Sequence, residues 1–455
     1  MPKTIVALAT PTGRSGIGVV RVSGEDALRI AQSMTAADFA PAPRAAHLKQ
    51  LVDPTFGDVV DEAIITYFKA PHSFTGEDVV EISCHGSPVL LRQVIDICLA
   101  QGARMAEAGE FSLRALANGR MNLAEAEAIR DLIDAQTRGA ARQAVRQLRG
   151  EFSNQLQPLK DELLNVIVVL ESALEFVEDD LPPTQIERVR KSLSDITADV
   201  AELADTFRAG HLIRDGLRVA IVGRPNVGKS SLFNALLGSE RAIVTDIPGT
   251  TRDHLHERFT INDIPISLID TAGLRDTTDT VESIGVARAR AVMSDADIVV
   301  VMLDVSEILT DEDREIINSV SDITHFIAAN KIDKKTASET RNFNSTINDQ
   351  QSTIIAISAK TGEGLDDLKR AIIDPFLTDE INTAGFLVTD ARHHDLLLRA
   401  KTEIEYSIEN LDARLSEEIT LIGLHNALRY LGEITGETTT EDMLTRIFST
   451  FCIGK

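Results

Sequence analysis

The sequence has few aromatic residues and few cysteines. It has no tryptophan, and aromatic residues make up only 4% of the chain. The hydrophobic cores must therefore be built from leucine, isoleucine, valine and alanine. The three cysteines are Cys84, Cys98 and Cys452. An odd number at this spacing fits neither a disulfide framework nor a zinc site, so we expect a reducing, cytoplasmic environment and no bound zinc.

Positive charge and long apolar runs are also scarce. The net charge is −24, which argues against a broad basic surface for nucleic acid, so any RNA contact would need a local basic patch or a basic partner. No stretch approaches 18 apolar residues, so we expect no membrane span. The first ten residues have one positive charge and a short apolar run, which predicts a first strand rather than a signal peptide.

A chain of 455 residues is too long for a single core, and its composition changes along its length. Residues 1–120 mix strand patterns, at 4–8, 18–22, 63–68 and 78–83, with a helical pattern at 89–101. This predicts an α+β N-terminal domain.

Two helical stretches flank a segment of alternating strands and helices. Residues 121–215 and 379–455 are helical in pattern, and Asn122 is a candidate N-cap. Residues 216–378 alternate apolar strands with helices, as a parallel sheet requires. The simplest organisation is one all-α helical domain into which an α/β domain is inserted. The predicted strands of the insert are 217–222, 266–270, 298–304, 324–330 and 353–357.

The segment Gly223-Arg-Pro-Asn-Val-Gly-Lys-Ser230 fits the phosphate-binding pattern G-x-x-x-x-G-K-[ST]. An apolar strand precedes it and a helical pattern follows it, so the loop N–H groups and the helix N-terminus together form an anion site. Lys229 is expected to reach the β- and γ-phosphates, and Ser230 to bind magnesium. The residues predicted to contact nucleotide here are Asn226, Val227, Gly228, Lys229, Ser230 and Ser231.

Further motifs follow this loop in the order expected of a Ras-like P-loop GTPase domain. Asp270-Thr-Ala-Gly273 ends a strand next to the phosphates, and Gly273 can offer its N–H to a γ-phosphate. Asn330-Lys-Ile-Asp333 selects guanine, because the Asp333 carboxylate can accept from the two adjacent donors on its edge. The backbone of Ser358-Ala-Lys360 can meet the guanine oxygen. The remaining predicted GTP contacts are Thr245, Thr250, Thr251, Asp270, Thr271, Ala272, Gly273, Asn330, Lys331, Asp333, Ser358, Ala359 and Lys360.

One position departs from the usual GTPase pattern. Leu274 stands where many GTPases place a glutamine that orients the attacking water, so hydrolysis must use another device. Magnesium is expected on Ser230 and Thr251. The phosphate loop and Thr245-Asp-Ile-Pro-Gly-Thr-Thr-Arg-Asp253 resemble the bacterial GTPases that use potassium and dimerise through their G domains. That resemblance implies a potassium site made by Asn226, Thr245, Ile247 and Thr250.

The two ends of the chain resemble the MnmE (TrmE) family of tRNA-modification GTPases. The motifs that carry this resemblance span the chain: Phe74-Thr-Gly-Glu-Asp78, Cys84-His-Gly86, Gly109-Glu-Phe-Ser112, Asn122-Leu-Ala-Glu-Ala-Glu-Ala-Ile129 and Phe451-Cys-Ile-Gly-Lys455. Such a protein is a homodimer that forms a heterotetramer with the FAD-dependent protein MnmG. Together they add a carboxymethylaminomethyl or aminomethyl group at C5 of the wobble uridine, position 34, of certain tRNAs.

The same resemblance implies a one-carbon donor and specific residues. The donor is a tetrahydrofolate in its 5-formyl or 5,10-methylene form, bound in the N-terminal domain by Arg21, Glu81, Arg120 and Lys455. Glu282 is the implied catalytic carboxylate, acting through a bridging water, and Cys452 is an implied catalytic thiol.

Three alternatives stay open. The central motifs would serve equally well in a regulatory GTPase of ribosome assembly without modification chemistry. Cys452 is either a functional thiol or a partly buried free thiol, whereas Cys84 and Cys98 are interpreted as core cysteines. A basic stripe on the helical domain is interpreted as a solvated helix face rather than an RNA contact. Its residues are Arg138, Arg142, Arg146 and Arg149.

Overall fold

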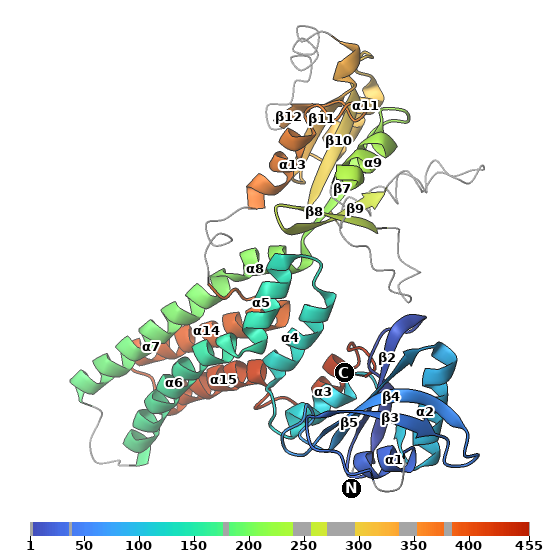
Figure 1. Ribbon diagram of the computed structural model, residues 1–455. Helices are drawn as coiled ribbons and strands as arrows, with labels where there is room; N and C mark the ends of the chain where they lie inside the picture. The colour runs from blue at the N-terminus through green and yellow to red at the C-terminus, as the bar shows by residue number, and fades with distance from the viewer. Residues whose placement is uncertain are drawn as a thin grey trace, which may run out of the picture. The chain divides into compact units, whose positions relative to one another are not determined.

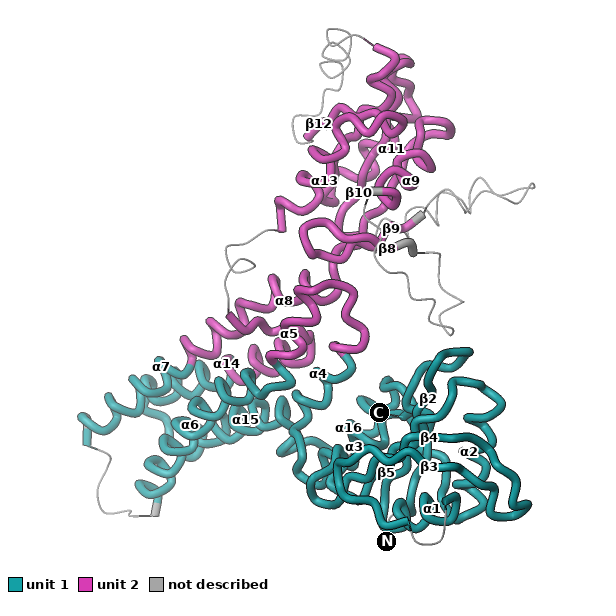
Figure 2. Tube along the Cα trace, viewed as in Figure 1, with its two compact units in different colours: residues 1–130, 147–196, 402–455 teal, residues 131–146, 197–401 magenta. Residues whose placement is uncertain are grey.

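A computed structural model describes residues 3–35, 39–175, 182–239, 256–270, 296–335, 353–376 and 385–454. The chain forms two compact units, one made of residues 1–130, 147–196 and 402–455 and the other of residues 131–146 and 197–401 (Figure 2). Within the described ranges, no helix combines the length and apolar character that crossing a bilayer requires.

The first unit contains the N-terminal α+β domain (Figure 1). Its sheet has the order β3-β4-β5-β2-β1-β6, antiparallel except for the β1–β6 pair. The strands are β1 (Ile5–Leu8), β2 (Ser15–Ser23), β3 (Ala46–Val52), β4 (Val59–Phe68), β5 (Val79–Gly86) and β6 (Arg104–Met105). The helices are α1 (Ala27–Ser33), α2 (Pro88–Ala100) and α3 (Glu110–Ala117).

Alternation along the strands gives this sheet one buried and one open face. Val20, Ile65 and Ile82 point into a core closed by Ile30 of α1 and Val94 of α2. The opposite face carries the residues in between, which are half-buried or exposed along β3, β4, β5 and β2.

The helices at 123–215 and 391–448 match the two predicted helical segments, 121–215 and 379–455. They are α4 (Leu123–Asp134), α5 (Arg138–Leu148), α6 (Glu151–Glu175), α7 (Pro183–Asp205), α8 (Phe207–Asp215), α14 (Ala391–Asp412), α15 (Glu417–Thr435) and α16 (Glu441–Phe448). Asn122 caps α4 as predicted: its Oδ1 accepts from the Glu125 N–H at 2.9 Å, and the Glu125 carboxylate accepts from the Asn122 N–H at 3.0 Å. In the first unit α6 packs against α15.

The C-terminal residues pack back onto the first unit. Phe448 and Phe451 are buried in a cluster with Leu123 of α4, and α16 contacts α3. An isolated bridge pairs Ala108 with Ile453. The last described residues therefore lie beside the N-terminal domain although they are more than 300 positions away in sequence.

The second unit contains the α/β domain predicted from 216 onward. Its sheet has the order β12-β11-β10-β7-β9-β8, and all neighbours are parallel except the β8–β9 hairpin. The strands are β7 (Leu217–Val222), β8 (His256–Ile261), β9 (Ile264–Asp270), β10 (Ile298–Asp304), β11 (His325–Asn330) and β12 (Thr353–Ala356). The helices that cover it are α9 (Lys229–Ser239), α11 (Asp311–Ser319) and α13 (Leu365–Ile373), with short 3-10 turns η2 (Ile332–Lys334) and η3 (Asp374–Phe376).

This domain has three layers. Leu232 and Leu236 of α9 and Leu368 of α13 pack on one face of the sheet, whereas Val320, after α11, packs on the other. The five predicted strands are confirmed. The edge strands β3, β6 and β8 were missed by the sequence analysis, since an edge strand has one partner and β6 has only two residues.

Candidate functional site

The phosphate loop joins β7 to α9, as the sequence predicted. Gly228 has φ +108°, and a Cβ atom there would lie 2.3 Å from the Asn330 amide nitrogen, so only glycine fits. Asn226 also has a positive φ, of 64°, which is uncommon for a residue with a side chain. The Asn226 side chain is exposed and makes no hydrogen bond to any described residue.

Lys229 and Ser230, the last two residues of the phosphate-binding pattern, lie in the first turn of α9. Lys229 Nζ donates to the carbonyl oxygens of Gly223 at 2.8 Å and Arg224 at 2.7 Å, so the ammonium lies over the loop backbone. Ser230 is exposed in the first turn of α9, and its hydroxyl makes no hydrogen bond within the described ranges. Such a hydroxyl remains available as a magnesium ligand.

Asn330 connects the guanine-recognition motif to two other loops. Asn330 is only 2% exposed. The amide nitrogen donates to the Val227 carbonyl at 2.8 Å, and the amide oxygen accepts from the Ala359 N–H at 2.9 Å. The Asn330 side chain is therefore hydrogen-bonded to both the phosphate loop and the Ser358–Lys360 loop. The Ala359 N–H is used here within the protein, whereas the sequence suggested that this backbone faces the base.

Asp333 uses one carboxylate oxygen in a contact with the Ser358–Lys360 loop. It lies in η2 and is exposed, and its Oδ1 accepts from the Ser358 hydroxyl at 2.8 Å. No described residue donates to Oδ2, which leaves one oxygen free for an N–H donor on the edge of a base.

Lys331 bridges the phosphate loop to a residue that the sequence analysis missed. Its Nζ donates to the Asn226 carbonyl at 2.8 Å and to Asp304 Oδ2 at 2.5 Å. Asp304 ends β10, and its side chain is 3% exposed. The signal available in the sequence was a single acidic residue ending an otherwise apolar strand.

Asp270 ends β9, and only its backbone is described. Several other predicted site residues lie outside the described ranges. They are Thr245, Ile247, Thr250, Thr251, Thr271, Ala272, Gly273, Glu282 and Lys455. Their roles stay predictions.

A second candidate site lies on the open face of the N-terminal sheet. Arg21 and Glu81 are register partners on β2 and β5, and the Arg21 Nε and Nη2 donate to Glu81 Oε1 at 2.9 and 2.8 Å. Arg21 Nη1 donates to the Gly454 carbonyl at 3.1 Å. The Arg21 Cζ lies 5.6 Å from the ring centroid of Phe74 and 5.7 Å from that of Phe111.

The structure therefore brings two of the predicted folate residues together with the C-terminal tail. Gly454 has φ +97°, and a Cβ atom there would lie 2.3 Å from the Leu8 carbonyl oxygen, so glycine is required where the tail meets β1. Arg120 is not joined to Arg21 directly. It donates to the Ser73 carbonyl at 3.2 Å, next to Phe74.

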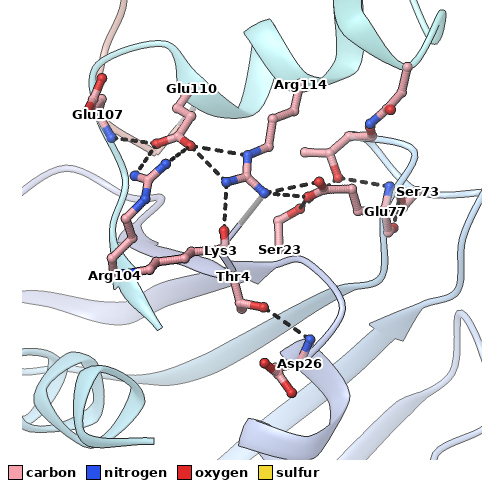
Figure 3. Close-up of polar contacts among 12 residues, drawn as sticks. Lys3, Thr4, Ser23, Asp26, Ser73, Glu77, Arg104, Glu107, Glu110 and Arg114 are labelled. Carbon is pink, nitrogen blue, oxygen red and sulfur yellow. Dashed lines mark hydrogen bonds and ion pairs between the residues drawn. The ribbon is translucent and has the colours of Figure 1, made fainter. Parts of the chain in front are cut away.

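A largely buried ion-pair network joins Glu77, Glu110 and Arg114 in the same domain (Figure 3). Glu110 is bound by Arg104 at 2.5 Å and Arg114 at 2.8 Å, and Arg114 binds Glu77 at 2.9 Å. Burial raises the pKa of Glu110, but hydrogen bonds from Arg104, the Glu107 N–H and Arg114 outweigh burial, so the pKa is lowered overall. The sequence analysis assigned no role to this network beyond the family resemblance of its motifs.

The cysteines differ in exposure. Burial, with a smaller contribution from Asp61, raises the pKa of Cys84 to about 12, and burial raises that of Cys98 to about 12, so both are core thiols. Cys452 is exposed rather than partly buried, and its carbonyl accepts from the Gly109 N–H at 3.5 Å.

In the basic stripe of α5 and the turn after it, Arg138, Arg142 and Arg149 are exposed, and Arg146 donates to the Gly385 carbonyl at 2.6 Å. This arrangement fits a mainly solvated helix face.

Comparisons with known proteins cover the whole chain. Residues 4–120 match the family described as GTP-binding protein TrmE N-terminus, and residues 123–452 match the MnmE helical domain. The tRNA modification GTPase MnmE of Koribacter versatilis is 43% identical, with 99% of each chain covered, and that of Aquifex aeolicus is 42% identical, with 100% of each covered.

Two solved structures are similar to part of this chain. The Era protein of Aquifex aeolicus is 28% identical and covers 41% of this chain and 66% of its own, with a TM-score of 0.30. The G domain of the T. maritima FeoB protein is 30% identical and covers 35% of this chain and 97% of its own, with a TM-score of 0.26.

The three-part fold class is confirmed, and the family resemblance is confirmed over the full length rather than over the central motifs alone. This excludes the ribosome-assembly alternative as the best description. The chain belongs to the MnmE family of tRNA modification GTPases.

Proposed function

We propose that this protein is a magnesium-dependent, potassium-activated GTPase that acts in the modification of the wobble uridine of tRNA. The observation that carries the proposal is Asn330, whose side chain joins the phosphate loop to the Ser358–Lys360 loop at 2.8 and 2.9 Å. With Asp333 beside them, these loops form one guanine-nucleotide site in a chain of the MnmE family.

The chain's own residues bind and orient the nucleotide. The loop N–H groups and α9 bind phosphate, and Asp333 accepts from the guanine edge. Ser230 and Thr251 would hold magnesium, which neutralises phosphate charge. Asn226, with Thr245, Ile247 and Thr250, would hold potassium, which offsets charge where other GTPases use an arginine. The Asn226 side chain is exposed and has no hydrogen-bond partner among the described residues, which supports this role. Glu282 would orient the attacking water, in place of the glutamine that many GTPases have at the position of Leu274.

Steady-state GTP turnover in potassium and then in sodium tests this part. We expect faster turnover in potassium, and Asn226→Ala should remove that difference. Asn318→Ala is the matched control, because Asn318 is exposed on α11 away from the loop. Equal wild-type rates in the two salts would contradict potassium activation.

We propose further that the open face of the N-terminal sheet binds a tetrahydrofolate in its 5-formyl or 5,10-methylene form. Both Arg21 bonds end on Glu81 Oε1, and no described residue donates to Oε2. A pterin ring carries neighbouring N–H donors that suit a carboxylate, and the Phe74 and Phe111 rings suit its flat surface. Arg120, Lys455 and the exposed thiol of Cys452, two residues before Gly454, would complete this site.

Calorimetry with 5-formyltetrahydrofolate tests this site. We expect binding to wild type and its loss in Glu81→Gln, with Glu62→Gln on the same sheet as control. Unchanged affinity in Glu81→Gln would contradict the assignment.

The proposed partners are a second copy of this chain, MnmG and tRNA, which together imply a cytoplasmic location. Leu48 and Ile64 are register partners on the open face and are 63% and 44% exposed, which supports a dimer through this sheet. The net charge of −24 supports MnmG as the source of basic surface for tRNA. Leu48→Asp should shift the dimer to monomer in light scattering, and MnmG should co-purify with the wild-type chain.

A further inference from the structure

Asp304 is a buried carboxylate that none of the recognised nucleotide motifs includes. It ends β10, and its side chain is only 3% exposed. Oδ1 accepts from the Ser306 N–H at 2.8 Å and from the Ser306 hydroxyl at 2.5 Å, whereas Oδ2 accepts from Lys331 Nζ at 2.5 Å. The carboxylate is therefore fixed on one side by its own turn, and it presents the other oxygen to Lys331.

Lys331 passes this constraint to the phosphate loop. Its ammonium also donates to the Asn226 carbonyl at 2.8 Å. Lys331 and Asn226 have φ values of 70° and 64°, which residues with side chains seldom adopt. Such backbone conformations persist only when the surroundings hold them. The Asp304–Lys331–Asn226 chain of contacts supplies such a hold on both residues.

We propose that Asp304 is a positioning residue for nucleotide binding. Its carboxylate holds the Lys331 ammonium against the Asn226 carbonyl, and this sets the phosphate loop in the conformation that receives the nucleotide. The inference rests on the proposed GTPase function and adds a residue outside its known motifs. It also sets the direction of the Asn226 side chain, the proposed potassium ligand.

The charges favour positioning over stability as the role of this pair. Burial raises the pKa of Asp304, but the bonds from Lys331 and Ser306 outweigh burial, so the pKa is lowered and the group is ionised at neutral pH. A buried ion pair gives little net stability, because desolvation offsets the attraction. The Asp304–Lys331 pair instead fixes the position of the Lys331 ammonium beside the phosphate loop.

Asp304→Asn tests the proposal, since it keeps the shape of the side chain, removes its charge and turns an N–H donor toward either the Lys331 ammonium or the Ser306 N–H. In the full chain, with magnesium and in sodium buffer, we expect the Kd for GDP to rise about tenfold, or ~1.4 kcal/mol. Asp322→Asn removes the same charge from an exposed loop and should leave the Kd unchanged. An unchanged Kd in Asp304→Asn would overturn the proposal.

A double-mutant cycle separates positioning from a general structural role. In a Lys331→Met background, Asp304→Asn should cause no further loss of GDP affinity, because Asp304 acts through Lys331. An equal tenfold loss in both backgrounds would overturn the proposal. If Asp304→Asn does not fold, Ser306→Ala keeps the charge and removes one bond to Oδ1. It should raise the Kd by about threefold, and an unchanged Kd would count against the proposal.

The effect of Asp304→Asn on potassium activation is measured in a separate experiment. The potassium concentration that half-activates GTP turnover should rise in Asp304→Asn. If the wild type shows no potassium activation, that part of the proposed function fails, while the GDP measurements in sodium still decide whether Asp304 positions the loop.

Discussion

Replacing Asn330 by alanine should destabilise the nucleotide-binding domain and weaken GDP binding together. The wild-type side chain makes two buried hydrogen bonds, to the Val227 carbonyl and from the Ala359 N–H. Val227 is 2% exposed and Ala359 is 8% exposed, so water cannot readily replace the lost partner. The variant therefore leaves one buried acceptor and one buried donor unsatisfied.

The size of the effect follows from these two groups. Each unsatisfied buried group costs about 1–3 kcal/mol, so we expect a loss of roughly 2–4 kcal/mol after partial relaxation. If misalignment of the two loops weakens the free energy of GDP binding by the same roughly 2–4 kcal/mol, the Kd for GDP rises roughly 30- to 700-fold.

Urea denaturation followed by circular dichroism measures the stability, because the chain has no tryptophan to report by fluorescence. The transition of this domain is the one that added GDP shifts to higher urea. Asn318→Ala, on the exposed face of α11, is the control and should change neither quantity. An Asn330→Ala protein with wild-type stability and wild-type GDP affinity would refute the role given to these two bonds.

Three further predictions concern single groups. Gly228→Ala should abolish GDP binding in calorimetry, because its Cβ would meet the Asn330 amide at 2.3 Å, whereas Gly238→Ala in α9, where a Cβ meets nothing, should bind normally. Glu110 has a lowered pKa, so the folded state binds fewer protons there than the unfolded state, and the stability it contributes is present above the unfolded pKa and lost as pH falls through the folded pKa. Thermal unfolding from about pH 6 to about pH 3 should therefore show a steep loss of stability that is shallower in Glu110→Gln. Iodoacetamide at about pH 8 should label Cys452 quickly but not Cys84 or Cys98, as peptide mass spectrometry would detect, and rapid labelling of a buried cysteine would contradict the fold.

The sequence predicted that the phosphate loop, Asn330–Asp333 and Ser358–Lys360 lie close together, because each follows an apolar strand, and the contacts of Asn330 with Val227 and Ala359 confirm that proximity. The carboxyl ends of parallel strands meet at one edge of a sheet, so β7, β10 and β11 carry their loops to the same place. The order of the motifs along the chain was enough to single out Lys229, Asn330 and Asp333 as candidates, and their roles toward the nucleotide stay predictions.

Contacts between segments far apart in the sequence were not predictable in this way. Asp304 has no motif of its own, and its role depends on the position of Lys331 across the sheet edge. Asp263, in the β8–β9 turn, accepts from the Arg138 N–H at 3.1 Å at the start of α5, 125 positions away. Arg21 and Glu81 are paired by strand register, which alternation of polar residues alone does not fix.

Nucleoside analysis of tRNA tests most directly whether this protein modifies tRNA as a GTPase of the MnmE family. In a strain lacking the gene, we predict that wobble uridine loses its carboxymethylaminomethyl or aminomethyl group at C5. The wild-type chain should restore the group, and a Lys229→Ala chain, which lacks the phosphate-loop ammonium, should not. Unchanged wobble nucleosides in the deletion strain would contradict the claim.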